Sequence, residues 1–208
     1  MGRQRRFHFS IKYSIGGAMV GAVLFTALLI GTVAYLSIRV FIFDDIRARL
    51  RSAVGIAALQ IDAGQHATIK GKEDESGESH KRLKRILQDI RKQDKDLRFV
   101  YTMKTNSSGQ FCFIVDAEND PKEMSHPWDV YDSPTPVLRA MFKPPFVTRV
   151  EAGFSTDKWG TWLSGFAPVL ATNGSLECIL GMDISAKRII DYQRRYLLNI
   201  ALICGIVC

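Results

Sequence analysis

The longest apolar stretch lies near the N-terminus, where residues 13–38 contain no Asp, Glu, Lys, Arg or His. A helix of about 20 apolar residues crosses the roughly 30 Å hydrocarbon core of a bilayer. We therefore expect a transmembrane helix over residues 13–38. A cleaved signal peptide is the alternative, but its apolar core is usually about 7 to 15 residues long and ends at a small-x-small site. Residues 35–39 offer no convincing site of that kind.

Helical spacing continues directly after this stretch. Apolar residues recur every three to four positions among charged ones, at Ile42, Ile46, Leu50, Val54, Ala57 and Ile61. This pattern predicts a stalk helix, which we expect Ala63 and Gly64 to end. Residues 65–79 are polar and are typical of an exposed loop, and residues 81–97 carry the single apolar stripe of a helix that packs on a sheet.

Five β-branched and aromatic runs follow. We expect strands at residues 98–104, 111–116, 146–151, 161–171 and 176–184. A Gly-bearing turn joins the first two, and Asn173 with Gly174, a strong hairpin signal, joins the last two. The prediction is an α+β domain with a five-stranded antiparallel sheet and a long N-terminal helix.

The C-terminal part of the chain changes from charged to apolar. Residues 186–195 look like an exit helix, whereas residues 196–208 carry no charge. Because residues 196–208 are too few to span a bilayer, we expect the sequence to stop inside a second, truncated membrane helix. A cytoplasmic output domain would then lie beyond it.

The charge distribution orients the chain. Arg3, Arg5, Arg6 and Lys12 precede the first apolar stretch without an acid, and basic flanks of membrane helices stay in the cytoplasm. We therefore expect residues 1–12 to be cytoplasmic and residues 39–195 to be extracytoplasmic. The net charge of +7 includes these four residues, and the other basic residues are interleaved with 21 acids. With no zinc-finger spacing or coherent basic stripe, nucleic acid is not an expected partner.

No pattern in the chain indicates catalysis, a metal or a cofactor. Motifs for a Ser-His-Asp triad, His-Glu-x-x-His or a phosphate-binding Gly loop are missing from the sequence. His66 and His80 flank a loop without the spacing of a metal site. Cys112 and Cys178 are the two cysteines that an oxidising compartment would let pair, although both fall inside expected strands and free buried thiols are the alternative.

Residues 118–145, which we call the covering segment, separate the two hairpins and hold most of the prolines together with Trp128, Tyr131 and Asp132. A long irregular segment inside a compact domain is more often a binding loop or lid than a passive connection. We therefore expect this segment to close a ligand site.

Four stretches carry a resemblance to a known family: residues 98–116, Tyr-Asp-Ser-Pro at 131–134, Thr-Asp-Lys-Trp-Gly-Thr-Trp-Leu-Ser-Gly-Phe-Ala-Pro at 156–168, and Gly-Met-Asp-Ile-Ser at 181–185. Over residues 40–190 the chain resembles the extracytoplasmic PAS-like Cache (PDC) sensor domains of bacterial histidine kinases, diguanylate cyclases and nucleotide cyclases. The resemblance implies a ligand pocket between the sheet and its covering loop. It also implies a small-molecule sensor in the bacterial inner membrane, with its domain in the periplasm or extracellular space.

Strand alternation selects the residues that share a face. The expected sets are Phe99, Tyr101 and Met103; Cys112, Ile114 and Asp116; Trp162, Ser164 and Phe166; and Ile179, Gly181 and Asp183. With the resemblance, they indicate candidate ligand-binding residues Tyr101, Asp116, Tyr131, Trp159, Trp162, Ser164 and Asp183.

Two questions about these candidates stay open. A buried carboxylate at Asp183 needs a donor, a cation or a ligand amine, but Asp183 and Asp157 also suit the capping of a turn or of the exit helix. Trp159 and Trp162 suit either the floor of a pocket or the core, the pocket being favoured for Trp159 and the core for Trp162.

Several functions are compatible with these features. The first is a ligand sensor that acts as a homodimer, since Gly17 and Gly21 match a small-xxx-small pattern in the first span. The second is a structural or protein-interaction domain. The third is a fragment of a sensor histidine kinase or a diguanylate or adenylate cyclase, whose catalytic domain follows residue 208, so that this segment itself is not an enzyme.

Overall fold

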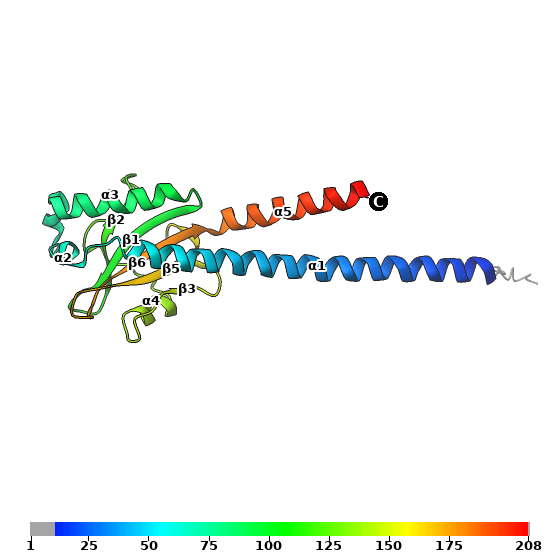
Figure 1. Ribbon diagram of the computed structural model, residues 1–208, viewed down its shortest axis with the longest axis horizontal. Helices are drawn as coiled ribbons and strands as arrows, with labels where there is room; N and C mark the ends of the chain where they lie inside the picture. Colours follow the sequence, from blue (N-terminus) through cyan, green and yellow to red (C-terminus); the bar gives the residue numbers. More distant parts are fainter. Residues whose placement is uncertain (1–10, 208) are drawn as a thin grey trace, which may run out of the picture. The chain divides into compact units, whose positions relative to one another are not determined.

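The computed structural model describes residues 11–207, with side chains over residues 15–199. The chain divides into two compact units, Met1–Ile42 and Phe43–Cys208. Helix α1 (Ile11–Ala58) is continuous through the end of the first unit and the start of the second (Figure 1). Arg3, Arg5 and Arg6, which orient the chain in the sequence, lie outside the described residues.

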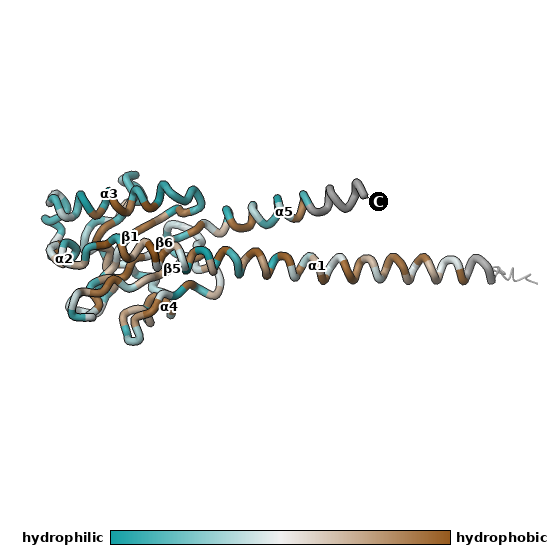
Figure 2. Tube along the Cα trace, viewed as in Figure 1, coloured by the Kyte–Doolittle hydropathy of each residue, from teal (hydrophilic) through white to brown (hydrophobic). Residues whose placement is uncertain are grey.

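Helix α1 is, among the described residues, the one helix long and apolar enough to cross a membrane. None of the residues in its most apolar stretch is buried. Figure 2 shows apolar positions, in brown, along this stretch. The apolar helix predicted over residues 13–38 is therefore present.

The stalk helix ends earlier than predicted. Helix α1 stops at Ala58, not at Ala63 and Gly64. Asp62 instead begins the short helix α2 (Ala63–His66), because its carboxylate accepts a hydrogen bond from the Gln65 N–H at 3.0 Å. The segment predicted as a loop also contains the 3-10 helix η1 (Lys72–Ser76).

The second unit is built on one antiparallel sheet. Its strands are β1 (Leu97–Thr105), β2 (Phe111–Asp116), β3 (Arg149–Val150), β5 (Gly160–Leu170) and β6 (Leu176–Ser185), in the order β2-β1-β6-β5-β3, with β4 (Ser155–Asp157) paired to β5 beside this path. The five-stranded path agrees with the prediction, and β4 is an additional short strand that the sequence did not indicate. The strand expected over residues 146–151 is reduced to β3.

Helices cover one face of this sheet. Leu50 of α1 lies so close to Gly165 of β5 that a Cβ at Gly165 would be 2.8 Å from the Leu50 Cγ. His66 of α2 reaches the same face and contacts the Thr102 hydroxyl at 2.9 Å. Helix α3 (Glu78–Gln93) starts and ends earlier than the expected range 81–97, and it buries Leu83, Leu87 and Ile90 in the amphipathic pattern that predicted it.

The chain leaves the sheet through α5 (Ala186–Val207), which begins at the residue predicted for the exit helix. The expected second span falls in the distal part of α5, where side chains beyond residue 199 lie outside the described residues. Cys112 and Cys178 are buried free thiols. Of the two alternatives for these cysteines, the structure therefore supports the unpaired one.

Candidate ligand-binding site

The face of the sheet opposite α1 is aromatic. Phe99, Tyr101 and Met103 of β1 lie in one buried cluster, as alternation predicted. Trp162 and Phe166 of β5 and Ile179 of β6 join the same cluster. Leu138 and Met141 of the short helix α4 (Pro136–Met141) cover it, so that the covering segment packs where the sequence placed it.

A β-bulge changes the face of β2. Tyr101 pairs with Asp116 and Thr102 with Val115, but Met103 pairs with Phe113, which leaves Ile114 as the extra residue. A bulge shifts alternation by one position. Asp116 consequently shares its face with Phe113, and the prediction that it lies with Cys112 and Ile114 is wrong.

Asp183 is the most deeply placed acid on this face, with 5% of its surface exposed. Its Oδ1 accepts a hydrogen bond from the Tyr101 hydroxyl at 3.3 Å, and the Ser164 hydroxyl also bonds to its carboxylate. Burial raises the pKa of Asp183 to about 7, helped by the charges of Asp157 and Asp116 and opposed by these two hydrogen bonds. The described bonds of Asp183 go to hydroxyl groups and not to the N–H groups of α5, so its side chain does not cap that helix.

Asp157 both caps a turn and orients aromatic side chains. Its Oδ1 accepts hydrogen bonds from the Trp159 N–H and from the Trp162 Nε1, each at 2.9 Å. Its Oδ2 accepts a bond from the Tyr131 hydroxyl at 3.1 Å. The capping interpretation is therefore right for Asp157, and the same carboxylate also fixes three aromatic residues at the site.

Asp116 anchors the beginning of the covering segment. Its two oxygens accept hydrogen bonds from the Glu118 N–H at 2.9 Å and the Ser125 N–H at 2.8 Å. Burial raises the pKa of Asp116, while these two backbone bonds oppose the shift. The Asp116 carboxylate therefore links β2, at the edge of the sheet, to the covering segment.

The aromatic rings of the site pack around Phe113. Its ring meets Tyr101, Tyr131 and Trp159 edge to face, at centroid distances of 5.2, 5.6 and 5.7 Å. Tyr131 and Trp159 stack at 6.2 Å with an interplanar angle of 23°. Tyr131 of the covering segment, Trp159 of the turn between β4 and β5, and Tyr101 and Phe113 of the sheet thus form a single aromatic group.

A cavity of about 20 Å³ lies between these rings and the acids. Five of the seven predicted residues line it, namely Tyr101, Asp116, Tyr131, Trp159 and Asp183. Trp162 instead lies in the core cluster, and Ser164 bonds to Asp183. A volume of this size accommodates about one water molecule, so a larger ligand requires the lining of the cavity to rearrange.

Five further lining residues were not among the candidates: Phe99, Phe113, Glu123, Ser125 and Asp157. Phe99 was placed on the correct face, and the alternation pattern was a sufficient signal for it. Phe113 was hidden by the bulge. Glu123 and Ser125 come from irregular backbone, for which the sequence offers no periodic signal.

Ion pairs hold the covering segment to the helical layer and to β1. The Glu118 Oε2 bonds to Arg98 at 2.6 Å and to Arg91 at 3.0 Å, and Arg98 also pairs with Glu123. Although burial opposes its ionisation, the bonds from Arg98 and from two backbone N–H groups lower the pKa of Glu118 to about 2. Further along, Lys72 pairs with Asp129 at 2.6 Å.

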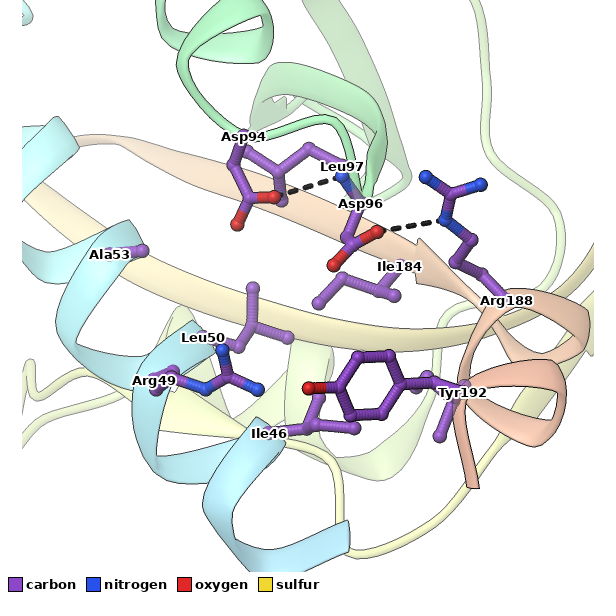
Figure 3. A pocket seen from close by; sticks show the side chains of 11 residues that line it. Ile46, Arg49, Leu50, Ala53, Asp94, Asp96, Leu97, Ile184, Arg188 and Tyr192 are labelled. Atoms are coloured by element: carbon purple, nitrogen blue, oxygen red, sulfur yellow. Dashed lines mark hydrogen bonds and ion pairs between the residues drawn. The ribbon is translucent and has the colours of Figure 1, made fainter. Parts of the chain in front are cut away.

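A second, larger cavity of about 140 Å³ separates α1 from α5 at the end of the sheet from which α5 leaves (Figure 3). Its buried side is apolar, formed largely by Leu50, Leu97 and Ile189. At its rim the Arg188 Nε donates to the Asp96 Oδ1 at 2.8 Å, which ties α5 to the start of β1. No pattern in the sequence predicts this cavity.

Comparison of the sequence with protein-family models and with curated proteins gives no match. Solved structures that match the fold include the ligand-binding domain of the Campylobacter jejuni chemoreceptor Tlp3 in complex with L-valine, with a TM-score of 0.52 and 12% identity. The sensory domain of the same chemoreceptor with isoleucine bound matches with a TM-score of 0.51 and 13% identity. Each match covers 83% of this chain and 65% of the other, less than two thirds of the neighbour's length. The chain therefore shares the fold of these solved sensory domains, which confirms the predicted α+β architecture with a long N-terminal helix and a PAS-like antiparallel sheet.

Proposed function

We propose that this chain is the extracytoplasmic small-ligand sensor part of a transmembrane signalling receptor. The main support for the proposal is the Asp183 carboxylate. Asp183 is 5% exposed and lines an aromatic cavity to which the covering segment contributes. A buried ionised carboxylate is costly without a cation, and a ligand can provide one. The solved sensory domains of similar fold contain L-valine or isoleucine, which agrees with a small-molecule ligand.

The placement in the membrane is part of the same proposal. Residues 1–12 would be cytoplasmic, residues 13–38 would cross a bacterial inner membrane, residues 39–195 would lie outside it, and residues 196–208 would begin a second span. The apolar stretch of α1 supports the first crossing. The basic N-terminus supports the orientation.

Signal relay would use the two helices attached to the sheet. Helix α1 packs on β5 through Leu50, and α5 continues directly from β6. A ligand that binds two arrangements of the domain with unequal affinity shifts their populations. The cavity between α1 and α5 would leave room for the distance between these two helices to change.

A homodimer through the stalk completes the proposal. Ile56 of α1 and Leu59, the residue directly after this helix, are 64% and 86% exposed, and Gly55 lies beside Ile56 in the sequence. Apolar side chains exposed at this level on a helix suit a second copy of the same helix. An output domain after residue 208, such as a histidine kinase or nucleotide cyclase, would receive the signal.

Thermal unfolding of the whole chain in lipid nanodiscs tests the sensor function. We would screen amines, amino acids, carboxylates and sugars, and compare the wild type with Asp183→Asn. We expect at least one class to raise the unfolding temperature of the wild type and to have a smaller effect on the variant. No shift by any class would contradict the proposal and favour a structural or protein-interaction domain.

A further inference from the structure

The charge of the cavity is unusual for a site that would hold an amino acid. Four of its lining residues are acids, namely Asp116, Glu123, Asp157 and Asp183. Among the described residues that line it, none is Lys, Arg or His. A carboxylate group brought into this cavity would face like charges without a basic partner, which is unfavourable in a partly buried site.

The acids do not form a metal site. Among the described residues there is no group of three or more His, Cys, Asp or Glu side chains placed to hold a metal ion. The oxygens of Asp157 and Asp116 are already engaged with N–H and O–H donors. Asp183, with two hydroxyl partners and no cation, is the acid left to attract a positive group.

The remaining surface of the cavity suits an organic cation. Tyr101, Phe113, Tyr131 and Trp159 contribute aromatic rings to it. The quadrupole of an aromatic ring attracts ammonium groups, and clusters of rings recognise quaternary ammonium ligands. Carboxylate and rings together favour a compact cation that carries methyl or methylene groups.

The neighbouring basic residues are held outside the cavity. Arg98 is paired with Glu118 and Glu123, and the Lys158 Nζ lies over the Trp159 ring at 4.2 Å. Arg149 also lies outside the cavity lining, but its Nε is buried without a hydrogen-bond partner. On β3 it is the backbone partner of Phe166 and so lies on the aromatic face, where the strands β6 and β5 separate it from β1. Arg149 is therefore the residue that would have to bind the carboxylate of an amino acid.

We propose that the ligand is a small organic cation without a carboxylate group, bound through an ammonium or quaternary ammonium group next to Asp183. This inference rests on the proposed function, because it names the ligand of the same cavity. Arg149 has no role in binding this ligand. Asp183 is the anion that the ligand neutralises, and the rings around Phe113 exclude water from the pair.

Titration calorimetry on the whole chain in nanodiscs tests the inference. The probes are choline and tetramethylammonium as cations, L-valine and L-isoleucine as zwitterions, and acetate as an anion. The variants are Asp183→Asn, Arg149→Gln and the matched control Asp89→Asn, which removes an exposed acid of α3. Thermal unfolding of each variant in the absence of probe verifies that it folds.

We expect a cation to bind, Asp183→Asn to weaken its binding at least tenfold, and Arg149→Gln and Asp89→Asn to change it less than twofold. Binding of L-valine, L-isoleucine or acetate that depends on Arg149 would overturn the cation inference and leave the sensor function standing. Cation binding that Asp183→Asn does not weaken would also overturn it, and no binding by any probe, together with no shift in the wider screen, would contradict both.

Discussion

The Tyr101 hydroxyl donates to the Asp183 Oδ1 at 3.3 Å, diagonally between the adjacent strands β1 and β6. Gly181 makes this contact possible, because Tyr101 pairs with it and the Tyr101 ring lies over the space that a side chain at 181 would occupy. Burial raises the pKa of Tyr101 well above its ordinary value, and the charge of Asp183 adds to the shift. Tyr101 therefore keeps its proton and can donate to Asp183 throughout the physiological pH range.

Stability should depend on pH through Asp183. Its pKa of about 7 in the folded protein lies above the ordinary value of 3.8, so the folded state retains a proton that the unfolded chain has lost. The stability from this proton is fully present below pH 3.8 and is lost as the pH rises through 7; between pH 4 and pH 7 the loss is about 3 kcal/mol. Urea unfolding of the wild type and Asp183→Asn at pH 4 and pH 7 should therefore give a stability difference that changes by this amount. A difference that does not vary with pH would contradict the assigned environment of Asp183.

Gly181→Ala should dislodge Tyr101. A Cβ at residue 181 would lie 2.4 Å from the Tyr101 Cε2 and 2.7 Å from its Cζ, which forces the ring to move. Overpacking of this kind costs about 1 to 3 kcal/mol. Urea unfolding measures the loss, and Gly153→Ala is the control because a Cβ there meets no atom within 4 Å. Equal stability of the two variants would show that the ring does not lie over Gly181.

Glu118→Gln should loosen the covering segment. The substitution removes the acid that pairs with Arg91 and Arg98. The Glu118 side chain is 8% exposed, whereas those of Arg91 and Arg98 are 24% and 39% exposed, so the loss should lie between about 1 kcal/mol, typical of an exposed pair, and roughly 3 kcal/mol, typical of a buried one. Urea unfolding and limited proteolysis within residues 118–135 would measure the effect. Glu123→Gln is the comparison, because its side chain is 37% exposed and the expected loss is below about 1 kcal/mol. A larger loss for Glu123→Gln would contradict the role of Glu118 as the main anchor.

Arg188→Gln should release the start of α5 without unfolding the domain. The Arg188 and Asp96 side chains are 52% and 36% exposed, so the ion pair contributes at most about 1 kcal/mol to global stability. Amide hydrogen exchange over residues 186–192 should nevertheless become faster, because this pair ties α5 to β1. Arg194→Gln, on an exposed position of the same helix, should leave exchange unchanged. Unchanged exchange in Arg188→Gln would show that packing alone fixes α5.

The sequence predicted the regular parts of the fold well. Strand β2 has the expected bounds, α5 begins at Ala186, and Phe99 and Tyr101 share the face that alternation assigned to them. These predictions succeeded because periodicity and hairpin turns act locally. The early end of α1 at Ala58 was missed because the helical pattern continues to Ile61, while the Asp62 cap starts a new helix.

The candidate site was predicted less completely, for two physical reasons. Apolar residues occupy consecutive positions of β2, so no alternation in the sequence reveals the bulge at Ile114 that turns Asp116 toward Phe113. Asp157 matched a turn signal, but its bonds to Tyr131 and Trp162 join residues that only the folded chain brings together.

Amide hydrogen exchange of the whole chain in nanodiscs, with and without saturating choline, tests the central claim most directly. If a cation binds between the sheet and the covering segment, exchange should slow by tenfold or more over residues 118–135 and at β1 and β6, and it should change over residues 186–192 of α5 as the signal passes. Asp183→Asn should abolish both effects. Protection confined to segments outside the cavity, or protection that persists in Asp183→Asn, would contradict the account of this cavity as the sensing site.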